Sequence, residues 1–255
     1  MTTIPLCFSE KAGFDKLVSR RKFSVLLLFA LTHSSSLLAQ KMSTKTYFSE
    51  PTAKLLDQAL AGAPILHSDL ASSKANINEK GMFGTTPIIF AVVMLNVGAV
   101  KTLLELGADP NIRQTDGHNA ITAAYEVLNA DKGLFELLVK SGKCDLNIRL
   151  PDDEPMIYYL AAAGRLELLK LTLQGGASPS LKTRTGKHLV IATALQEQYD
   201  AVQLLLDAGA SAQTTDLAGR SLLEWVKRGS SQRIDPQGPV NQSRLRLLSR
   251  LSKVQ

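Results

Sequence analysis

Cysteine is almost absent from this 255-residue sequence, occurring only at Cys7 and Cys144. We expect the segment that contains Cys7 to be removed, which leaves one thiol and no internal disulfide. Cysteine usage therefore neither supports nor excludes an oxidising compartment. Aromatic residues are also scarce, at 5% of the chain with Trp225 the single tryptophan, whereas apolar residues reach 45%. This composition favours closely packed small helices over a β-sandwich.

The groupings that would indicate an enzyme are missing from the sequence. There are four histidines: His33, His67, His118 and His188. They show neither metal-ligand spacing nor a paired carboxylate. Cys144 fits a small apolar filler better than a nucleophile, and the acidic residues 152–154 fit a solvated helix start better than a cation site. The glycines form no phosphate-binding loop, so we expect a non-enzymatic protein without metal or cofactor.

A long apolar run is absent as well. The stretch 23–31 is almost entirely apolar, but a transmembrane helix needs about 20 such residues. Basic residues at 20–22 precede the stretch, and Ala39 stands at a suitable cleavage point. This order predicts an export signal over residues 1–39, followed by a linker over 40–47.

The predicted signal has features of two export routes. Arg20 and Arg21, followed by Phe23, resemble the twin-arginine signal that carries folded chains to the bacterial periplasm. Ordinary Sec export fits nearly as well. Two alternatives stay open: the segment is an uncleaved anchor, or translation begins at Met42 and the protein stays in the cytosol.

Glycine recurs in this sequence at a period of about 33 residues. One set consists of Gly84, Gly117, Gly186 and Gly219, with Asp153 in the remaining position. A second set consists of Gly107, Gly142, Gly176 and Gly209, which open the stretches GADPN, GKCDLN, GASPS and GASAQ. Asn78 precedes Asn111 by one period and adds a degenerate first copy. Repetition of this kind predicts an array of similar structural units.

The period and the motif resemble the ankyrin repeat family. The best copy is residues 84–111, and its motif residues are Thr86, Pro87, Ile88 and Ala91. The resemblance covers roughly residues 48–230. It implies an all-α fold, an ankyrin-repeat solenoid of stacked helix-turn-helix units with short β-hairpin-like fingers, and a module that binds another protein.

The repeat boundaries divide the array into six units. These are an N-terminal capping repeat (48–83), four repeats (84–116, 117–152, 153–185 and 186–218) and a degenerate C-terminal capping repeat (219–255). Residues 129–144 carry about three extra positions, which we expect to distort the second helix of their repeat and the turn after it. Residues 53–63 predict a capping helix, and 229–242 predict a loop before a basic amphipathic helix.

Local chemistry within the best copy predicts where its helices begin and end. We expect Thr86 to cap the first helix by accepting a backbone N–H, with Pro87 at the first helical position. Val100, Leu103 and Leu104 have the spacing of an apolar face on a second helix. We expect Gly107 to end that helix in the left-handed conformation.

The formal net charge of +6 is unevenly distributed. Residues 40–218 carry 16 basic and 19 acidic side chains, whereas residues 219–255 carry eight and two. Because the body is mildly acidic, we do not expect nucleic acid as a partner. The last helix holds Arg244, Arg246, Arg250 and Lys253. These cations suit either lipid headgroups or the solvated face of a capping helix, and we favour the cap.

Ankyrin proteins usually bind partners through their finger tips and inner helices. Those positions in this sequence give a protein-binding set that changes from apolar, through acidic, to basic. Its members are Met82, Phe83, Val93, Met94, Asp116, His118, Glu126, Asp152, Glu154, Arg184, Lys187, Gln196, Arg220 and Arg228. Met82 and Phe83 suit exposed anchors, although they also suit packing beneath the N-terminal cap.

The resemblance and the predicted signal together favour a monomeric protein-binding module in the periplasm. An immunity or inhibitor protein that neutralises a toxic, periplasm-acting effector fits this description. A helper of a periplasmic oxidative-stress enzyme fits it too. Two further alternatives are a membrane-peripheral protein that uses its basic C-terminal helix, and a cytosolic interaction adaptor translated from Met42.

Overall fold

The computed structural model describes residues 43–229, 235 and 237–253. Secondary structure in these residues is helical, apart from three isolated bridges between short stretches of backbone. All of the described helices belong to one unit, which begins at Thr44. The export-signal residues Arg20, Arg21, Phe23 and Ala39 lie outside the described residues.

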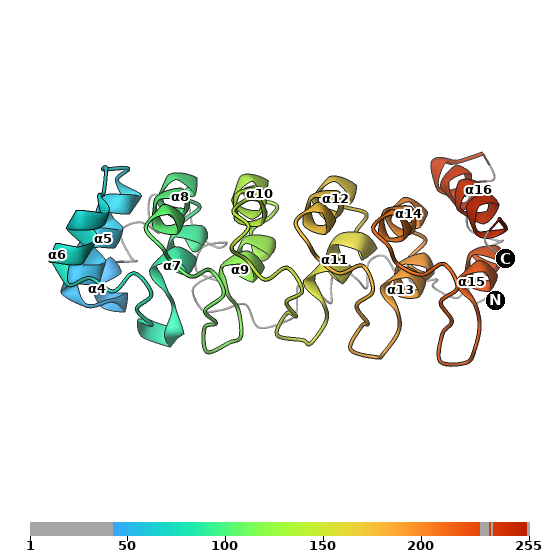
Figure 1. Ribbon diagram of the computed structural model, residues 1–255, viewed down its shortest axis with the longest axis horizontal. Helices are drawn as coiled ribbons and strands as arrows, with labels where there is room; N and C mark the ends of the chain where they lie inside the picture. The colour runs from blue at the N-terminus through green and yellow to red at the C-terminus, as the bar shows by residue number, and fades with distance from the viewer. Residues whose placement is uncertain (1–42, 230–234, 236, 254–255) are drawn as a thin grey trace, which may run out of the picture. The chain divides into compact units, whose positions relative to one another are not determined.

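The helices of this unit form two rows, with loops projecting on one side (Figure 1). The inner row, next to the loops, contains α7 (Pro87–Val93), α9 (Ala120–Glu126), α11 (Met156–Ala162), α13 (Leu189–Leu195) and α15 (Leu222–Arg228). The outer row contains α8 (Val97–Glu105), α10 (Lys132–Lys140), α12 (Leu166–Gln174), α14 (Tyr199–Asp207) and α16 (Pro239–Leu251). Before them come α4 (Thr44–Tyr47), α5 (Glu50–Leu60), α6 (His67–Ser73) and the short 3-10 turn η1 (Met82–Gly84).

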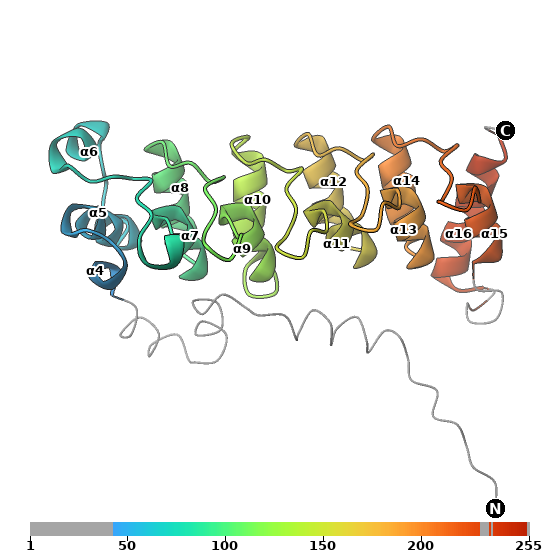
Figure 2. The same ribbon diagram turned by 90° about the horizontal axis from the view of Figure 1, so that it is seen from below.

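Each inner helix pairs with the outer helix that follows it, and the pairs stack in chain order (Figure 2). All seven residues of α7 are buried, because the helix is covered by α8 and by both neighbouring repeats. The outer helix α8 buries Ala99, Val100, Leu103 and Leu104, which lie on one face. Isolated helices this short are unstable in water, so contacts between repeats supply most of the stability. The predicted all-α ankyrin-repeat solenoid is confirmed.

Side-chain size alternates along the inner row. The fourth residues of the five inner helices are Phe90, Ala123, Tyr159, Ala192 and Trp225. Large and small residues thus alternate from one repeat to the next, an arrangement that suits close packing of neighbouring helices. The first large ring, that of Phe90, packs edge-on against those of Tyr47 and Phe48, with centroid distances of 5.3 and 5.9 Å. Helix α4 and its neighbour Phe48 therefore close this end of the core.

The loops between an outer helix and the next inner helix are the fingers, at residues 106–119, 141–155, 175–188 and 208–221. Each ends in a backbone hairpin; in the third finger the Thr183 N–H donates to the Lys187 carbonyl at 2.8 Å. The tip residue Gly186 has a φ of 79°, which favours glycine. Asp153 occupies the same position in the second finger with a φ of 65°, as its place in the glycine series predicts.

An asparagine ladder links successive repeats at the base of the fingers. The side-chain carbonyls of Asn78, Asn111 and Asn147 accept the backbone N–H groups of Asp109, Asp145 and Ser178, at 2.7 to 2.8 Å. Each bond joins one repeat to the next and satisfies a backbone donor in a turn. Serine and glutamine stand at the two following ladder positions, 180 and 213.

The extra residues of the second repeat lie elsewhere than the sequence analysis expects. Helix α10 keeps the nine residues of its neighbours, so the prediction of a distorted second helix is wrong. Five residues, 127–131, connect α9 to α10, whereas three connect α7 to α8. The turn that begins at Gly142 is one residue longer than the corresponding turn at Gly107. Insertions collect in these turns because a turn lengthens without disturbing the packed helix faces.

Three other local predictions need correction. Thr86 stands at the N-cap of α7 as predicted, but its buried hydroxyl makes no hydrogen bond within the described part of the chain. Residues 44–47, expected to be linker, form α4, because Thr44 is buried and donates to Asp57 at 2.8 Å. The predicted loop over 229–242 ends early, since Pro239 starts α16 at a position that suits proline.

The C-terminal helix α16 acts as a cap. Its Leu247 and Leu251 are buried against α14 and α15. Arg244 donates to the carbonyl of Val226 at 2.7 Å, while Arg246 and Arg250 pair with Asp200 and Asp207 of α14. Three of the four cations considered for lipid contact are thus engaged within the chain. Within the described residues, no helix combines the length and apolarity that crossing a bilayer requires.

Candidate functional site

The predicted binding residues lie at two levels, the ends of the inner helices and the finger tips, which together we call the inner surface. Those that are exposed are Met82, Phe83, Asp116, Arg184, Lys187, Gln196 and Arg228. Those that are half-buried are Met94, His118, Glu126, Asp152 and Arg220. The remaining two, Val93 and Glu154, are buried.

Val93 and Glu154 are therefore corrections. Val93 is only 4% exposed and belongs to the core of its repeat, because α7 is covered on all sides. Glu154 is 8% exposed, and its carboxylate lies 3.3 Å from Nε of Arg184 while accepting the Arg184 backbone N–H at 3.1 Å. It joins two fingers and is not available to a partner.

The N-terminal end of the inner surface is an exposed apolar tip. Met82 and Phe83 are 41% and 50% exposed, so packing beneath the cap is excluded for both. Phe83 has a left-handed φ of 58°. Its carbonyl accepts the backbone N–H and the hydroxyl of Thr115, at 3.1 and 2.9 Å. These bonds tie the tip to the next finger.

The middle of the inner surface holds a tyrosine–acid cluster, formed by Tyr125, Glu126, Asp152, Tyr158 and Tyr159. The rings of Tyr125 on α9 and Tyr159 on α11 lie 6.1 Å apart, and those of Tyr158 and Tyr159 lie 5.7 Å apart. The Tyr159 hydroxyl donates to the carboxylate of Asp152 in the second finger. Two repeats and one finger thus bring aromatic faces and two carboxyl groups together.

The carboxyl group of Glu126 is held in an unfavourable environment. Burial, reinforced by the negative charge of Asp152, raises its pKa from 4.5 to about 7. Burial and the charge of Glu126 also raise the pKa of the Tyr125 hydroxyl. A nearby cation, Arg165, donates to Asn129 at 2.9 Å at the border of the cluster.

The C-terminal end of the inner surface is basic. Arg220 pairs with Asp216 at 2.8 Å and lies 4.3 Å from the ring centre of Trp225, in a cation–π contact. The Trp225 indole N–H donates to the same Asp216 at 3.0 Å. Arg228, on the same helix as Trp225, and Lys187, in the third finger, are exposed. The inner surface thus runs from apolar through acidic to basic side chains along the stack of repeats.

The remaining reactive side chains do not assemble. Burial raises the pKa of the Cys144 thiol to about 12, which leaves it protonated and unreactive. Burial lowers the pKa of His118 despite the opposing charge of Asp116. Among the described residues, no group of three or more histidine, cysteine or acidic side chains is placed to hold a metal.

Sequence reasoning missed the aromatic half of the cluster. The sequence analysis assigns none of Tyr125, Tyr158 and Tyr159 to the binding surface. A signal was present, because these are three of only five tyrosines and all three fall on inner helices of neighbouring repeats. Their contact depends on how closely α9 and α11 stack, which the repeat period does not specify.

Comparisons with known proteins agree with this architecture. The family model of the ankyrin repeat matches residues 83–114, and the solved structures of similar fold are ankyrin-repeat solenoids. Such repeats are generally non-enzymatic modules that bind other proteins. The ankyrin repeat protein L371 of Acanthamoeba polyphaga mimivirus is 27% identical over 150 residues, covering 58% of this chain and 19% of its own length. This chain thus spans about a fifth of the length of that curated relative.

Two solved structures share the fold at low sequence identity. One is a chain in the complex of the predatory endopeptidase Bd0816 from Bdellovibrio bacteriovorus with the immunity protein Bd3460, with a TM-score of 0.52 and 22% identity. That match covers 79% of this chain and 98% of the other. An ankyrin repeat domain from Acinetobacter baumannii AYE gives a TM-score of 0.56 at 17% identity, over 89% and 97% of the two chains.

Proposed function

We propose that this protein is exported to the bacterial periplasm and binds a periplasm-acting effector through its inner surface, as an immunity or inhibitor protein. The observation that carries the proposal is the gathering of an apolar tip, an acidic aromatic centre and a basic end on one surface. Aromatic, methionine and arginine side chains of this kind are typical of binding hot spots.

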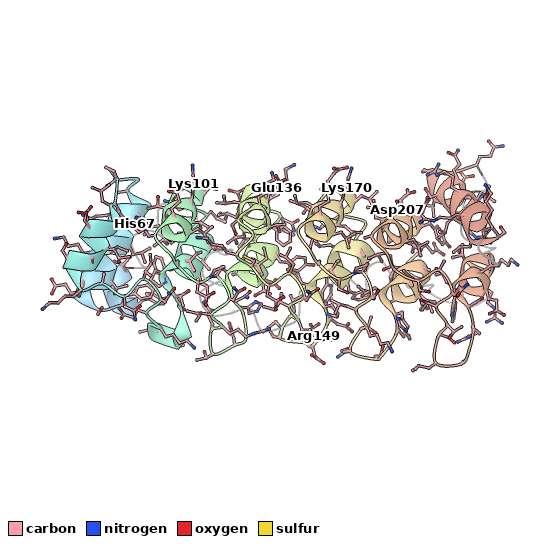
Figure 3. All side chains as sticks on the ribbon, viewed as in Figure 1. His67, Lys101, Glu136, Arg149, Lys170 and Asp207 are labelled. Atoms are coloured by element: carbon pink, nitrogen blue, oxygen red, sulfur yellow. The ribbon has the colours of Figure 1, made fainter. Side chains whose placement is uncertain are left out.

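Several charges on the outer helices are paired within the chain. Some pair along one helix, as in Lys101 with Glu105 and Lys140 with Glu136. The α16 arginines pair with Asp200 and Asp207. Figure 3 shows Lys101, Glu136, Lys170 and Asp207 on the outer row, away from Arg149 on the fingers. Exposed apolar side chains occur on both sides, with Met82 and Phe83 on the inner side and Val97 and Leu245 on outer helices.

The immunity role is supported by architecture and by one neighbour. An array closed at both ends suits a rigid stoichiometric binder, because little order is lost on association. A chain of similar fold occurs in a complex of an endopeptidase with an immunity protein. The predicted signal over residues 1–39 supports action in the periplasm.

Export is tested by fractionating cells that express the full chain. We expect the protein in the periplasmic fraction, starting after Ala39. Changing both Arg20 and Arg21 to lysine is expected to stop export if the twin-arginine route is used and to leave Sec export intact. Recovery of the intact chain from the cytosol alone would refute the periplasmic part of the proposal.

Binding is tested by placing a photo-crosslinking amino acid at Gln196 on the inner surface or at Lys170 on the outer one. We expect crosslinks to a partner from Gln196 only. In cells that produce an effector encoded next to this protein, Lys187→Glu should reduce protection, whereas the matched outer change Lys170→Glu should not. Equal loss from both variants, or crosslinks only from Lys170, would contradict the assignment.

A further inference from the structure

The third finger, residues 175–188, differs in charge from the other three fingers. It carries three cations, Lys182, Arg184 and Lys187, and no acidic side chain, whereas each of the other fingers contains at least one aspartate. All three cations are exposed. The third finger is therefore a basic projection from the stack of repeats, and we call it the basic finger.

Bonds from the second finger hold the basic finger in place. The Arg149 guanidinium donates to the carbonyl of Lys182 at 2.9 Å, and the Glu154 carboxylate accepts the backbone N–H of Arg184 at 3.1 Å. The backbone hairpin at the tip adds a further restraint. Because the backbone is already ordered, the basic finger can bind a ligand without the entropy cost of fixing a loop.

The charge of the basic finger is only partly neutralised within the chain. Arg184 pairs through Nε with Glu154 at 3.3 Å, and its side chain remains 49% exposed. Within the described residues, the ammonium groups of Lys182 and Lys187 form no hydrogen bond or ion pair. Burial, and second the charge of Lys182 across the hairpin, lower the pKa of His188. The surroundings of the basic finger are therefore positive.

Acidic side chains on other fingers limit what the occupant can be. Asp116 of the first finger is exposed, and the side chain of Asp153 in the second finger is 73% exposed, 3.9 Å from Arg149. A nucleic acid or an anionic lipid surface presents continuous negative charge and would meet these carboxylates as well, so like charges would oppose it. A protein segment can place its carboxylates at one finger only, and the charge pattern therefore favours a protein.

Carboxylates of a protein segment match the donors of the basic finger. Lysine ammonium and arginine guanidinium groups form charge-assisted hydrogen bonds with carboxylates, and these are stronger than bonds between neutral groups. A basic segment would be repelled. An apolar segment that covered the finger would remove water from the ammonium groups of Lys182 and Lys187 without replacing its hydrogen bonds.

We propose that the basic finger receives a short acidic segment of the partner protein, whose aspartate or glutamate side chains pair with Lys182, Arg184 and Lys187. The inference rests on the proposed function, since it names the chemistry by which the inner surface recognises its partner. Attraction between opposite charges also guides diffusional encounter, so the basic finger speeds association and fixes the register of the partner along the stack.

The first test uses a small acidic probe with the full chain. An acetylated peptide amide of alternating aspartate and glutamate is titrated into protein labelled with 15N-glycine, whose signals are assigned with the variants Gly186→Asn and Gly117→Asn. We expect the signal of Gly186, at the tip of the basic finger, to shift, while that of Gly117, at the same position of the first finger, stays unchanged. The matching peptide of asparagine and glutamine should cause no comparable shift. Equal shifts with both peptides, or no shift of Gly186, would overturn the proposal.

Two further probes distinguish a protein segment from other anions. A short DNA duplex and vesicles of phosphatidylglycerol are each added at the same concentration of negative charge as the acidic peptide. We expect either probe to shift or broaden the Gly186 signal less than the peptide does. A larger effect from the duplex or the vesicles would overturn the assignment to a protein segment and indicate recognition of phosphate groups.

The second test removes charge from the basic finger. The double variant Lys182→Gln, Lys187→Gln should bind the acidic peptide at least about threefold more weakly, because two exposed ion pairs are lost. The matched double variant Lys101→Gln, Lys170→Gln on outer helices should bind as the original protein does. Both pairs of lysines are exposed, so we expect both variants to fold. A basic-finger variant that binds the acidic peptide as tightly as the original protein overturns the inference.

The partner complex separates this inference from the proposed function. If Gln196 crosslinks to a partner and the Lys182→Gln, Lys187→Gln variant binds it about threefold more weakly at low salt, with a smaller difference at high salt, the inference is supported. If the crosslink forms and this variant binds the partner equally well, the basic-finger inference fails while protein binding stands. If no inner-surface crosslink forms, the proposed function fails, whereas the peptide titration still reports on the basic finger by itself.

Discussion

Replacing Glu126 with glutamine is expected to make this protein more stable at neutral and alkaline pH. The pKa of Glu126 is about 7 in the folded protein, against an ordinary value of 4.5. Below pH 4.5 the carboxyl is protonated in both the folded and the unfolded chain and costs nothing. Between these values the unfolded chain loses its proton first, so the free energy of unfolding falls as pH rises and levels off above pH 7.

The size of the effect follows from the difference between the two pKa values. A carboxyl whose pKa is raised from 4.5 to about 7 destabilises the fold by about 3 kcal/mol when it is fully ionised. Residual solvent contact around the half-buried side chain reduces this to about 1–2 kcal/mol. The causes of the raised pKa are the burial of the carboxyl and, second, the negative charge of Asp152, which adds to the cost. Arg165 lies at the border of the cluster, bound to Asn129.

The assay is urea unfolding of the original protein and of Glu126→Gln at pH 5 and pH 8. The variant should be more stable by about 1–2 kcal/mol at pH 8 and by less at pH 5, where the cost of the raised pKa has only partly developed. Glu136→Gln controls for the loss of a carboxylate on a helix. A stability difference that does not change with pH, or a variant less stable at pH 8, would refute the reasoning. A loss of stability of this kind is expected where a charged side chain is retained for binding.

Three further predictions concern stability and are checked by the same unfolding experiment. Asn111→Ala should lower the free energy of unfolding by about 1–2 kcal/mol, because it leaves the Asp145 N–H unpaired. Ser180→Ala, at the equivalent position of a later repeat, should change the free energy of unfolding little. Equal effects of the two changes would contradict a role for the asparagine ladder. Tyr199→Phe should leave the stability unchanged or raise it, because the buried Tyr199 hydroxyl has no hydrogen-bond partner within the described residues. A loss of stability above about 1 kcal/mol would show that the hydroxyl does make a hydrogen bond. Asp153→Gly should raise the free energy of unfolding by about 0.5–1 kcal/mol, because glycine adopts the left-handed φ without strain. A clear loss of stability would show that the Asp153 carboxylate contributes more than the backbone strain costs.

Local chemistry was the part of the fold that could be predicted. Pro87 begins α7 and Gly107 adopts a left-handed φ of 94°, because these residue types fit few other positions. Prediction failed where a repeat meets its surroundings. The Thr86 hydroxyl lost its expected capping bond, and Val93 was assigned to the surface although a neighbouring repeat covers it.

The candidate site divides in the same way. The repeat pattern predicts that Asp116, Arg184 and Lys187 are exposed finger residues, because the finger tips recur at a fixed distance from the glycines of the repeat. It could not show that Glu154 is neutralised by Arg184, since that pair joins adjacent fingers. It also could not show which side chains meet across neighbouring helices.

The sequence alone determined that this protein is a stack of similar helical pairs, because a period of about 33 residues repeats the same turn and helix signals. Only the tertiary structure decided what the stack presents to a partner. The distance between α9 and α11 sets the contact of Tyr125 with Tyr159, and the same packing desolvates Glu126 beside Asp152. Ring contact and desolvation depend on the summed positions of many side chains, and no single repeat encodes them.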